Sequence, residues 1–193
     1  MKKFYLTFSV ILVFGLVLSA CATPPTDEMN KAHDAVIRAE NDADAVTYAG
    51  NTLVRARDAL TRMQNEADAK RYDTAKNFAS EAIDLAERAI ADGKTGAARA
   101  KSEAENMYNS LEAPLAETAG ALDTAKQTDN LALNFDNLSE DMDLAHRTYN
   151  EAGQSLETGD YQDTVVKSQS VRSILADINN DITNAAVSVS RKQ

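Results

Sequence analysis

The stretch from Leu131 to Tyr161, "LALNFDNLSEDMDLAHRTYNEAGQSLETGDY", has the clearest periodicity in the chain. Its apolar side chains recur at steps of three and four residues, which places them on one face of a helix, whereas a strand would need steps of two. Gly159 and Asp160 then follow, and a glycine just beyond the last turn commonly ends a helix. The stretch therefore predicts an amphipathic helix that is closed by a turn at Gly159. The residues of its apolar stripe are Leu131, Phe135, Leu138, Met142, Ala145, Tyr149, Ala152 and Leu156.

Similar stripes, mostly of alanine, run through the rest of the chain. A composition rich in alanine, with no tryptophan and only three prolines, favours helix throughout. Breaks are expected at residues 48–51, at Pro114 and at residues 128–130. The sequence therefore predicts an all-α fold, an elongated antiparallel bundle of five or six helices. The further stripes cover residues 29–46, 53–67, 75–111, 115–125 and 171–189.

The two halves of the chain look alike when Tyr72 is aligned with Tyr161. In both copies a helix ends, a short turn follows, and the tyrosine opens the next helix. This pattern indicates two degenerate helical repeats. The alternative is that any two helices of heptad pattern can be aligned in this way. The same shift pairs Leu53 with Met142, Ala56 with Ala145, Leu60 with Tyr149, Met63 with Ala152, Ala82 with Val171, Leu85 with Ile174 and Ala89 with Ile178.

The N-terminus has the form of a secretory signal peptide. Lys2 and Lys3 precede an apolar run over residues 4–18, and small residues then lead to Cys21, the only cysteine. The segment Leu18-Ser19-Ala20-Cys21 resembles the bacterial lipobox. That resemblance implies a diacylglycerol on the Cys21 thiol, cleavage before Cys21, and an acyl chain such as palmitate on the new amine. The alternative is an ordinary secretory signal with an incidental cysteine.

These features predict the domain organisation. Residues 1–20 form the signal peptide and residues 21–26 a lipidated tether. Residues 27–112 form a first helical unit and residues 113–193 a second, and the two are expected to make one continuous bundle. Two or three acyl chains hold a protein durably on a membrane, since each buried methylene contributes about 0.8 kcal/mol.

The stretch from Ala45 to Lys94 resembles a family of small bacterial envelope lipoproteins of unknown function. It shares the Tyr48-Ala49 break, the Tyr72-Asp73 helix opening and the ladder of alanines that follows. The family often has proline after the Tyr-Ala pair, where this chain has Gly50. The resemblance implies an Ala-rich helical hairpin or bundle, sometimes carried beside a peptidoglycan-binding domain, and no catalytic residues.

The net charge argues against nucleic acid as a partner. Removal of Lys2 and Lys3 takes the formal charge from −10 to −12, and no basic cluster could neutralise a run of phosphates. The partners expected instead are the membrane, through the acylated Cys21, and a protein of the cell envelope, with peptidoglycan as a further option. Ala22, rather than aspartate, follows the cysteine, which favours the outer membrane, with the body facing the periplasm.

Residue types that carry chemistry are sparse. His33 and His146 are the only histidines, far apart in sequence, and surface positions on amphipathic helices are expected for both. The acidic residues Glu140, Asp141 and Asp143 lack the spacing of a calcium loop and are expected on a solvated face. No nucleophile elbow, zinc motif or phosphate loop is present. The chain is therefore predicted to have no enzymatic activity, cofactor or metal.

The function predicted from these observations is that of a membrane-anchored helical interaction or scaffold module. Its exposed helix grooves would bind a partner. One rival is a carrier of a lipid or small apolar ligand between helices, although stripes of alanine argue against a roomy pocket. Association with peptidoglycan is the other rival.

Overall fold

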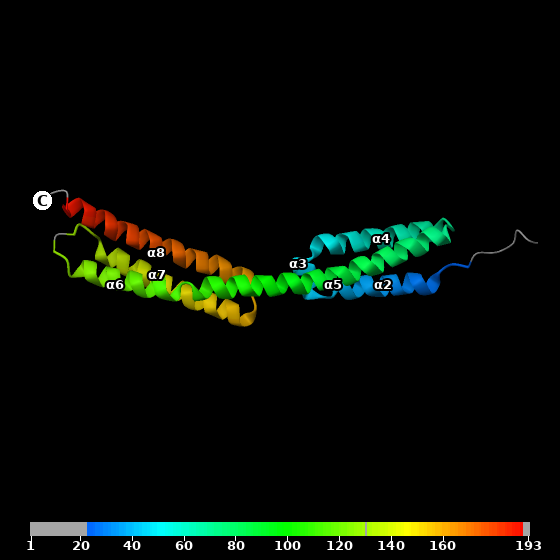
Figure 1. The fold of residues 1–193 in the computed structure, drawn as a ribbon, viewed down its shortest axis with the longest axis horizontal. Coiled ribbons are helices and arrows are strands. Elements are labelled where there is room, and N and C mark those ends of the chain that lie inside the picture. Colours follow the sequence, from blue (N-terminus) through cyan, green and yellow to red (C-terminus); the bar gives the residue numbers. More distant parts are fainter. Residues whose placement is uncertain (1–22, 130, 191–193) are drawn as a thin grey trace, which may run out of the picture. The chain divides into compact units, whose positions relative to one another are not determined.

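A computed structural model describes residues 23–129 and 131–190, and every regular element in those ranges is a helix (Figure 1). Six of these helices are long, and α3 has only six residues, so both the all-α class and the expected number are confirmed. The helices are α2 (Thr26–Glu40), α3 (Ala43–Tyr48), α4 (Gly50–Asp68), α5 (Tyr72–Asn109), α6 (Glu112–Lys126), α7 (Phe135–Thr158) and α8 (Tyr161–Ser190).

The chain divides into two compact units, one ending at Lys94 and the other beginning at Thr95. The expected boundary after residue 112 differs, because α5 runs from Tyr72 to Asn109 without a break at Gly93 or Gly96. The first part of α5 therefore belongs to the first unit and the remainder to the second.

Three expected helix ends lie elsewhere in the structure. The stripe over residues 29–46 is broken after α2, because Asp42 caps α3 and accepts a hydrogen bond from the Ala45 amide at 2.9 Å. The stripe that starts at Leu131 becomes helical only at Phe135, where the Asn134 side chain accepts from the Asn137 amide at 3.2 Å. Pro114 lies in the first turn of α6, where its missing N–H removes no helical hydrogen bond.

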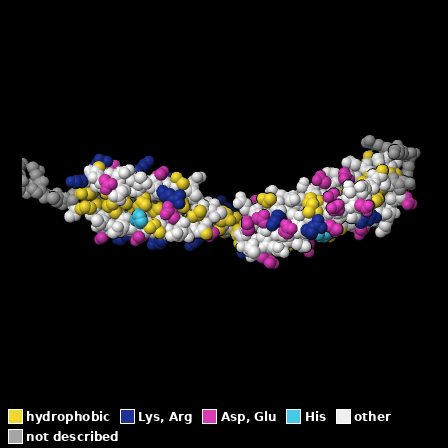
Figure 2. All heavy atoms as spheres, turned by 180° about the vertical axis from the view of Figure 1, so that it is seen from behind, with side chains coloured by type: hydrophobic (Ala, Val, Ile, Leu, Met, Phe, Trp, Pro, Cys, Tyr) yellow, Lys and Arg dark blue, Asp and Glu magenta, His cyan; other side chains and the backbone are white. Residues whose placement is uncertain are grey.

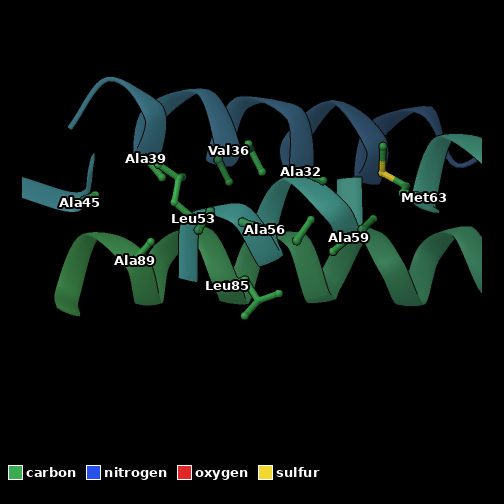
Figure 3. Close-up of a cluster of buried hydrophobic side chains, with 14 of the residues drawn as sticks. Ala32, Val36, Ala39, Ala45, Leu53, Ala56, Ala59, Met63, Leu85 and Ala89 are labelled. Atoms are coloured by element: carbon green, nitrogen blue, oxygen red, sulfur yellow. The ribbon is translucent and has the colours of Figure 1, made fainter. Parts of the chain in front are cut away.

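The core of the first unit is built largely from alanine. α2, α3, α4 and the first part of α5 contribute buried side chains to one cluster, and eleven of its fifteen buried members are alanines (Figure 3). Small side chains allow helix axes to approach closely, but each buries little apolar area. Leu53 and Val36 are the largest side chains of this cluster that are almost wholly buried.

Gly93 shows how close this packing becomes. A Cβ atom built on Gly93 would lie 2.5 Å from the Ala45 amide nitrogen and 2.7 Å from the Asp44 carbonyl carbon. These are backbone atoms of α3, so a side chain at position 93 could not be accommodated by rotation of a neighbour. The glycine is therefore required by the approach of α5 to α3.

The second unit has a core of larger side chains. Residues of α6, α7 and α8, with Leu111, form its cluster, and only Ala145 among the nine buried members is alanine. The nine are Leu111, Leu115, Leu122, Leu138, Met142, Ala145, Val171, Leu175 and Ile178. α7 and α8 lie side by side along their length, and α6 packs against both (Figure 1).

The α4–α5 and α7–α8 hairpins share the same turn. Lys70 and Gly159, which are 89 residues apart, both have the left-handed backbone conformation, with φ of 59° and 81°. The Arg71 amide donates to the Glu66 carbonyl, and the Asp160 amide donates to the Ser155 carbonyl, both at 2.9 Å. This bond pattern is the Schellman motif at the end of a helix.

The shift of 89 residues also aligns the buried faces of α5 and α8. Five buried positions of α5 fall on five buried positions of α8, although the buried Leu85 falls on Ile174, which is only partly buried. The internal-repeat interpretation is therefore supported for these two hairpins. The pairs are Ala75 with Thr164, Ala79 with Ser168, Ala82 with Val171, Ala86 with Leu175 and Ala89 with Ile178.

The shared turn leads to a stability prediction. Lys70→Gly is expected to raise the free energy of unfolding by about 1 kcal/mol, because a side chain at a left-handed position costs about 1–2 kcal/mol. Gly159→Ala is expected to lower it by a similar amount. Urea denaturation followed by circular dichroism would measure both. Equal stability of all three proteins would contradict the conformations of residues 70 and 159.

Candidate functional site

The predicted lipidation residue, Cys21, lies outside the described residues, and its modification stays a prediction. In residues 23–129 and 131–190, no helix combines the length and the apolar character that a membrane-crossing segment needs. Acidic and basic side chains are interspersed over the face shown in Figure 2.

The titratable residues considered in the sequence are placed on helix surfaces. His33 on α2 and His146 on α7 are exposed, as predicted, and belong to different units. Glu140, Asp141 and Asp143 are exposed on α7. Within the described ranges, no group of three or more histidine, cysteine or acidic side chains is arranged to hold a metal ion.

A cluster that the sequence did not reveal lies at the α7–α8 turn. The buried Ser155 hydroxyl lies 2.5 Å from the Asp163 carboxylate, and Lys167 Nζ donates to Ser155 Oγ at 3.1 Å. Lys167 also pairs with Asp163 at 2.6 Å. A serine beside a lysine is the arrangement of a nucleophile and its base, so the protonation of this cluster decides its chemistry.

The protonation of Lys167 and Asp163 favours a structural role for this turn cluster over a catalytic one. The hydrogen bond that Lys167 donates to the Asp163 carboxylate raises the pKa of Lys167. The same bond, together with the one that Ser155 donates, lowers the pKa of Asp163. A lysine that holds its proton more firmly than usual is a poor base for Ser155. The cluster therefore ties the end of α7 to the start of α8.

The equivalent turn of the first unit is tied by a different pair. Glu66, 89 residues before Ser155, accepts hydrogen bonds from Arg71, one of them from Nη2 at 2.9 Å. This contact lowers the pKa of Glu66 and raises that of Arg71. The two repeats thus preserve the turn while their polar contacts differ.

A tyrosine pair occupies the second unit. The Tyr108 and Tyr149 rings stack with centroids 4.5 Å apart and planes 4° from parallel. A Cβ atom at Gly153 would lie 2.8 Å from the Tyr108 hydroxyl oxygen, so this glycine leaves room for the ring. The hydrogen bond with Tyr108, together with burial, raises the pKa of Tyr149 to about 12.

The raised pKa of Tyr149 predicts how stability depends on pH. Between its usual value of 10.0 and about 12, the unfolded chain loses this proton while the folded chain keeps it. The contribution of Tyr149 to the free energy of unfolding is therefore fully present below about pH 10 and is lost as the pH rises toward about 12. Tyr149→Phe is expected to flatten this decline. Urea midpoints measured across the alkaline range would test it, and identical slopes in both proteins would contradict it.

A hollow with three exposed apolar side chains on its lining lies where α3 meets α4. Only Ala49 separates the two helices, and the chain bends there around a hollow of about 630 Å³. We call it the elbow hollow; it is lined by residues 46–54 together with Arg57 and Asp92. Val46, Tyr48 and Val54 on this lining are 51%, 37% and 49% exposed.

Local sequence explains the elbow. Asp42 starts α3, and Gly50 is the first residue of α4, the position at which proline is favoured in helices. This is the position at which the resembling family often has proline. Leu53 is buried beneath the hollow, while the charged side chain of Arg57 on its rim donates to Glu40 at 2.6 Å. The rim charge is thus paired within the unit, and the valines stay exposed.

Two further hollows lie in the second unit. One, of about 620 Å³, is lined mostly by polar and charged residues and lies along α5 and α8, where Arg172 donates to the Ser110 hydroxyl at 3.1 Å. The other, of about 410 Å³, lies between the ends of α6 and α8, and we call it the apolar hollow. It is lined by Ala121, Thr124, Ala125, Thr128, Leu131, Ile182, Ala186 and Val189.

Comparison with known families finds an uncharacterised domain that includes the resembling residues 45–94. A search of curated proteins and a search of solved structures each gave no match. Residues 27–107 match the model of a family described as a domain of unknown function, DUF4398. The match covers α2, α3, α4 and most of α5, and so contains the elbow hollow, the alanine core and the whole of the resembling stretch.

Proposed function

We propose that this protein is a lipid-anchored interaction module of the bacterial cell envelope, with Cys21 acylated at the outer membrane and the helical body in the periplasm. The elbow hollow is its docking surface for an envelope protein. The observation that carries this proposal is the exposure of Val46, Tyr48 and Val54 around one hollow. Apolar side chains gathered on a concave surface are typical of interaction sites.

The chemistry of the elbow defines the partner. Arg57 is paired with Glu40, and Asp92 lies 3.5 Å from the Arg88 side chain, so the rim charges are matched within the unit. A partner would therefore gain mainly by placing apolar side chains against the two valines. An amphipathic helix presents such side chains at steps of three and four residues.

In-cell crosslinking tests this docking surface. A photocrosslinking residue at position 47, within the lining, is expected to capture one partner. Val54→Asp is expected to weaken that capture at least about tenfold, since burying a valine contributes about 1.5–3 kcal/mol. Val166→Asp is the matched control, because Val166 is also an exposed helical valine but lies in the second unit.

The outcomes separate the proposed role from its rivals. Loss of the crosslink with Val54→Asp, but not with Val166→Asp, would support docking at the elbow. Equal crosslinking in all three proteins would contradict it. Retention on purified peptidoglycan that is unaffected by Val54→Asp would favour association with the cell wall instead.

A further inference from the structure

We propose that the apolar hollow of the second unit binds one straight alkyl chain, supplied by a single-chain lipid such as a fatty acid. This binding site is separate from the elbow hollow and goes beyond the interaction role. Its location between α6 and α8 lies outside the matched residues 27–107.

The lining selects for hydrocarbon. Its two hydroxyl groups already donate to main-chain carbonyls: Thr124 to Gly120 at 2.8 Å and Thr128 to Thr124 at 2.9 Å. None of the described lining residues is charged. A ligand inside would therefore meet neither an opposite charge nor a free side-chain donor, and an uncharged alkyl chain is complementary to such a surface.

The same lining disfavours a peptide. Each peptide unit brings an N–H and a C=O group that must be hydrogen-bonded when it is buried. The side chains of the apolar hollow offer a peptide C=O no free donor, because both threonine hydroxyls already donate to main-chain carbonyls, and they offer its N–H groups only two hydroxyl oxygens. An alkyl chain carries no such requirement.

The volume of the hollow fits one chain. At about 410 Å³ it lies near the lower end of the range of about 300–1,000 Å³ that is typical of small-molecule sites. Leu131, Ile182 and Val189 on its lining are only partly buried. A bound chain would remove their remaining apolar surface from water, which is the main source of affinity in such sites.

The source of the chain follows from membrane affinity. A single acyl chain holds a molecule to a bilayer only weakly and reversibly, whereas two or three chains hold it firmly. Single-chain lipids therefore leave the bilayer and become available, while the anchor proposed at Cys21 stays inserted. The hollow is thus assigned to an exchangeable lipid.

The test uses the full mature chain with Cys21→Ser, which has no acyl chains of its own. Fluorescence of cis-parinaric acid is expected to rise saturably, with one site per chain, and saturated fatty acids are expected to displace it. Each pair of methylenes removed from the competitor should weaken displacement about tenfold. Ala186→Phe, which fills the exposed edge of the hollow, should weaken binding at least tenfold.

Val187→Phe is the matched control, because Val187 follows on the same helix, is exposed and does not line the hollow. Unchanged binding in this control, with loss in Ala186→Phe, supports the site. Leu131→Asp, which lies outside the helices, gives the same test if Ala186→Phe lowers the helix content. Absence of saturable binding, displacement independent of chain length, or equal loss in the control would overturn the proposal. Binding by the Cys21→Ser chain but not by the acylated chain would assign the hollow to the protein's own anchor.

Discussion

Gly93→Val is expected to abolish the stable packing of the first unit, whereas Gly120→Ala is expected to stabilise the second. A Cβ atom at position 93 would meet the α3 backbone at 2.5 Å, while at position 120 it would meet nothing within 4 Å. Both glycines lie inside helices, α5 and α6. The comparison therefore separates steric fit from helix propensity.

The expected changes in the free energy of unfolding have opposite signs at Gly120 and Gly93. Alanine is favoured over glycine in a helix interior by about 1 kcal/mol, which is the gain expected for Gly120→Ala. At Gly93 the same gain is opposed by an overpacking cost of about 1–3 kcal/mol. We expect a cost at the upper end of this range, because the contact is with backbone atoms that cannot rotate away. Gly93→Ala should therefore lose about 1–2 kcal/mol net, and the larger Gly93→Val should lose more.

Denaturation and amide exchange would measure these effects. Urea unfolding gives the free energies, and hydrogen exchange should become faster in α3 and α4 of the Gly93 variants while α7 and α8 keep their protection. A Gly93→Ala protein as stable as the wild type would show that α3 and α5 do not approach as described. A Gly120→Ala protein that is less stable would show that α6 is packed differently.

Gly93 also illustrates what the sequence could not reveal. Two glycines three residues apart in a helical stretch normally argue against a continuous helix, because each one costs stability there. The structure nevertheless continues α5 through both, and the contact with Ala45 gives Gly93 a packing role. Ala45, the contacted residue in α3, is 48 residues away from Gly93 in sequence. Only tertiary placement relates the two.

Local signals predicted the helix class and several helix ends. The tyrosines that open α5 and α8 were expected, as was the end of α7 at Gly159. These features depend on periodicity and on turn chemistry, which neighbouring residues determine. The start of α7 was misplaced, because the apolar residues Leu131 and Leu133 continue the helical spacing although Asn134 caps the helix.

The candidate sites depended on contacts that sequence spacing does not encode. Ser155, Asp163 and Lys167 come together only because the turn at Gly159 reverses the chain. The break at Tyr48 and Ala49 was predicted, but the hollow around it requires Asp92 of α5 beside α4. The apolar hollow joins Ala121 to Ala186 across two helices. Alanine-rich stripes argued against such a pocket, and that argument fits the first core better than the second.

Cys21→Ser is expected to move the protein from the membrane fraction to the soluble fraction. Two or three acyl chains, at about 0.8 kcal/mol for each buried methylene, dominate any surface attraction of an acidic body to anionic lipid. An uncleaved signal peptide could hold the variant on the membrane for another reason. Residues 1–20 of the variant should therefore be replaced by a leader that signal peptidase cleaves without lipidation.

Labelling and processing complete this test. The wild-type protein should incorporate an alkyne analogue of palmitate and sediment with vesicles, and globomycin should cause the uncleaved precursor to accumulate. The Cys21→Ser protein should incorporate no label and remain in the supernatant with the same helix content, because Cys21 precedes the first described helix at Thr26. Sedimentation of this variant at the wild-type level, or a precursor size that globomycin does not change, would contradict acylation at Cys21. The elbow hollow would then have to be explained without a tethered body.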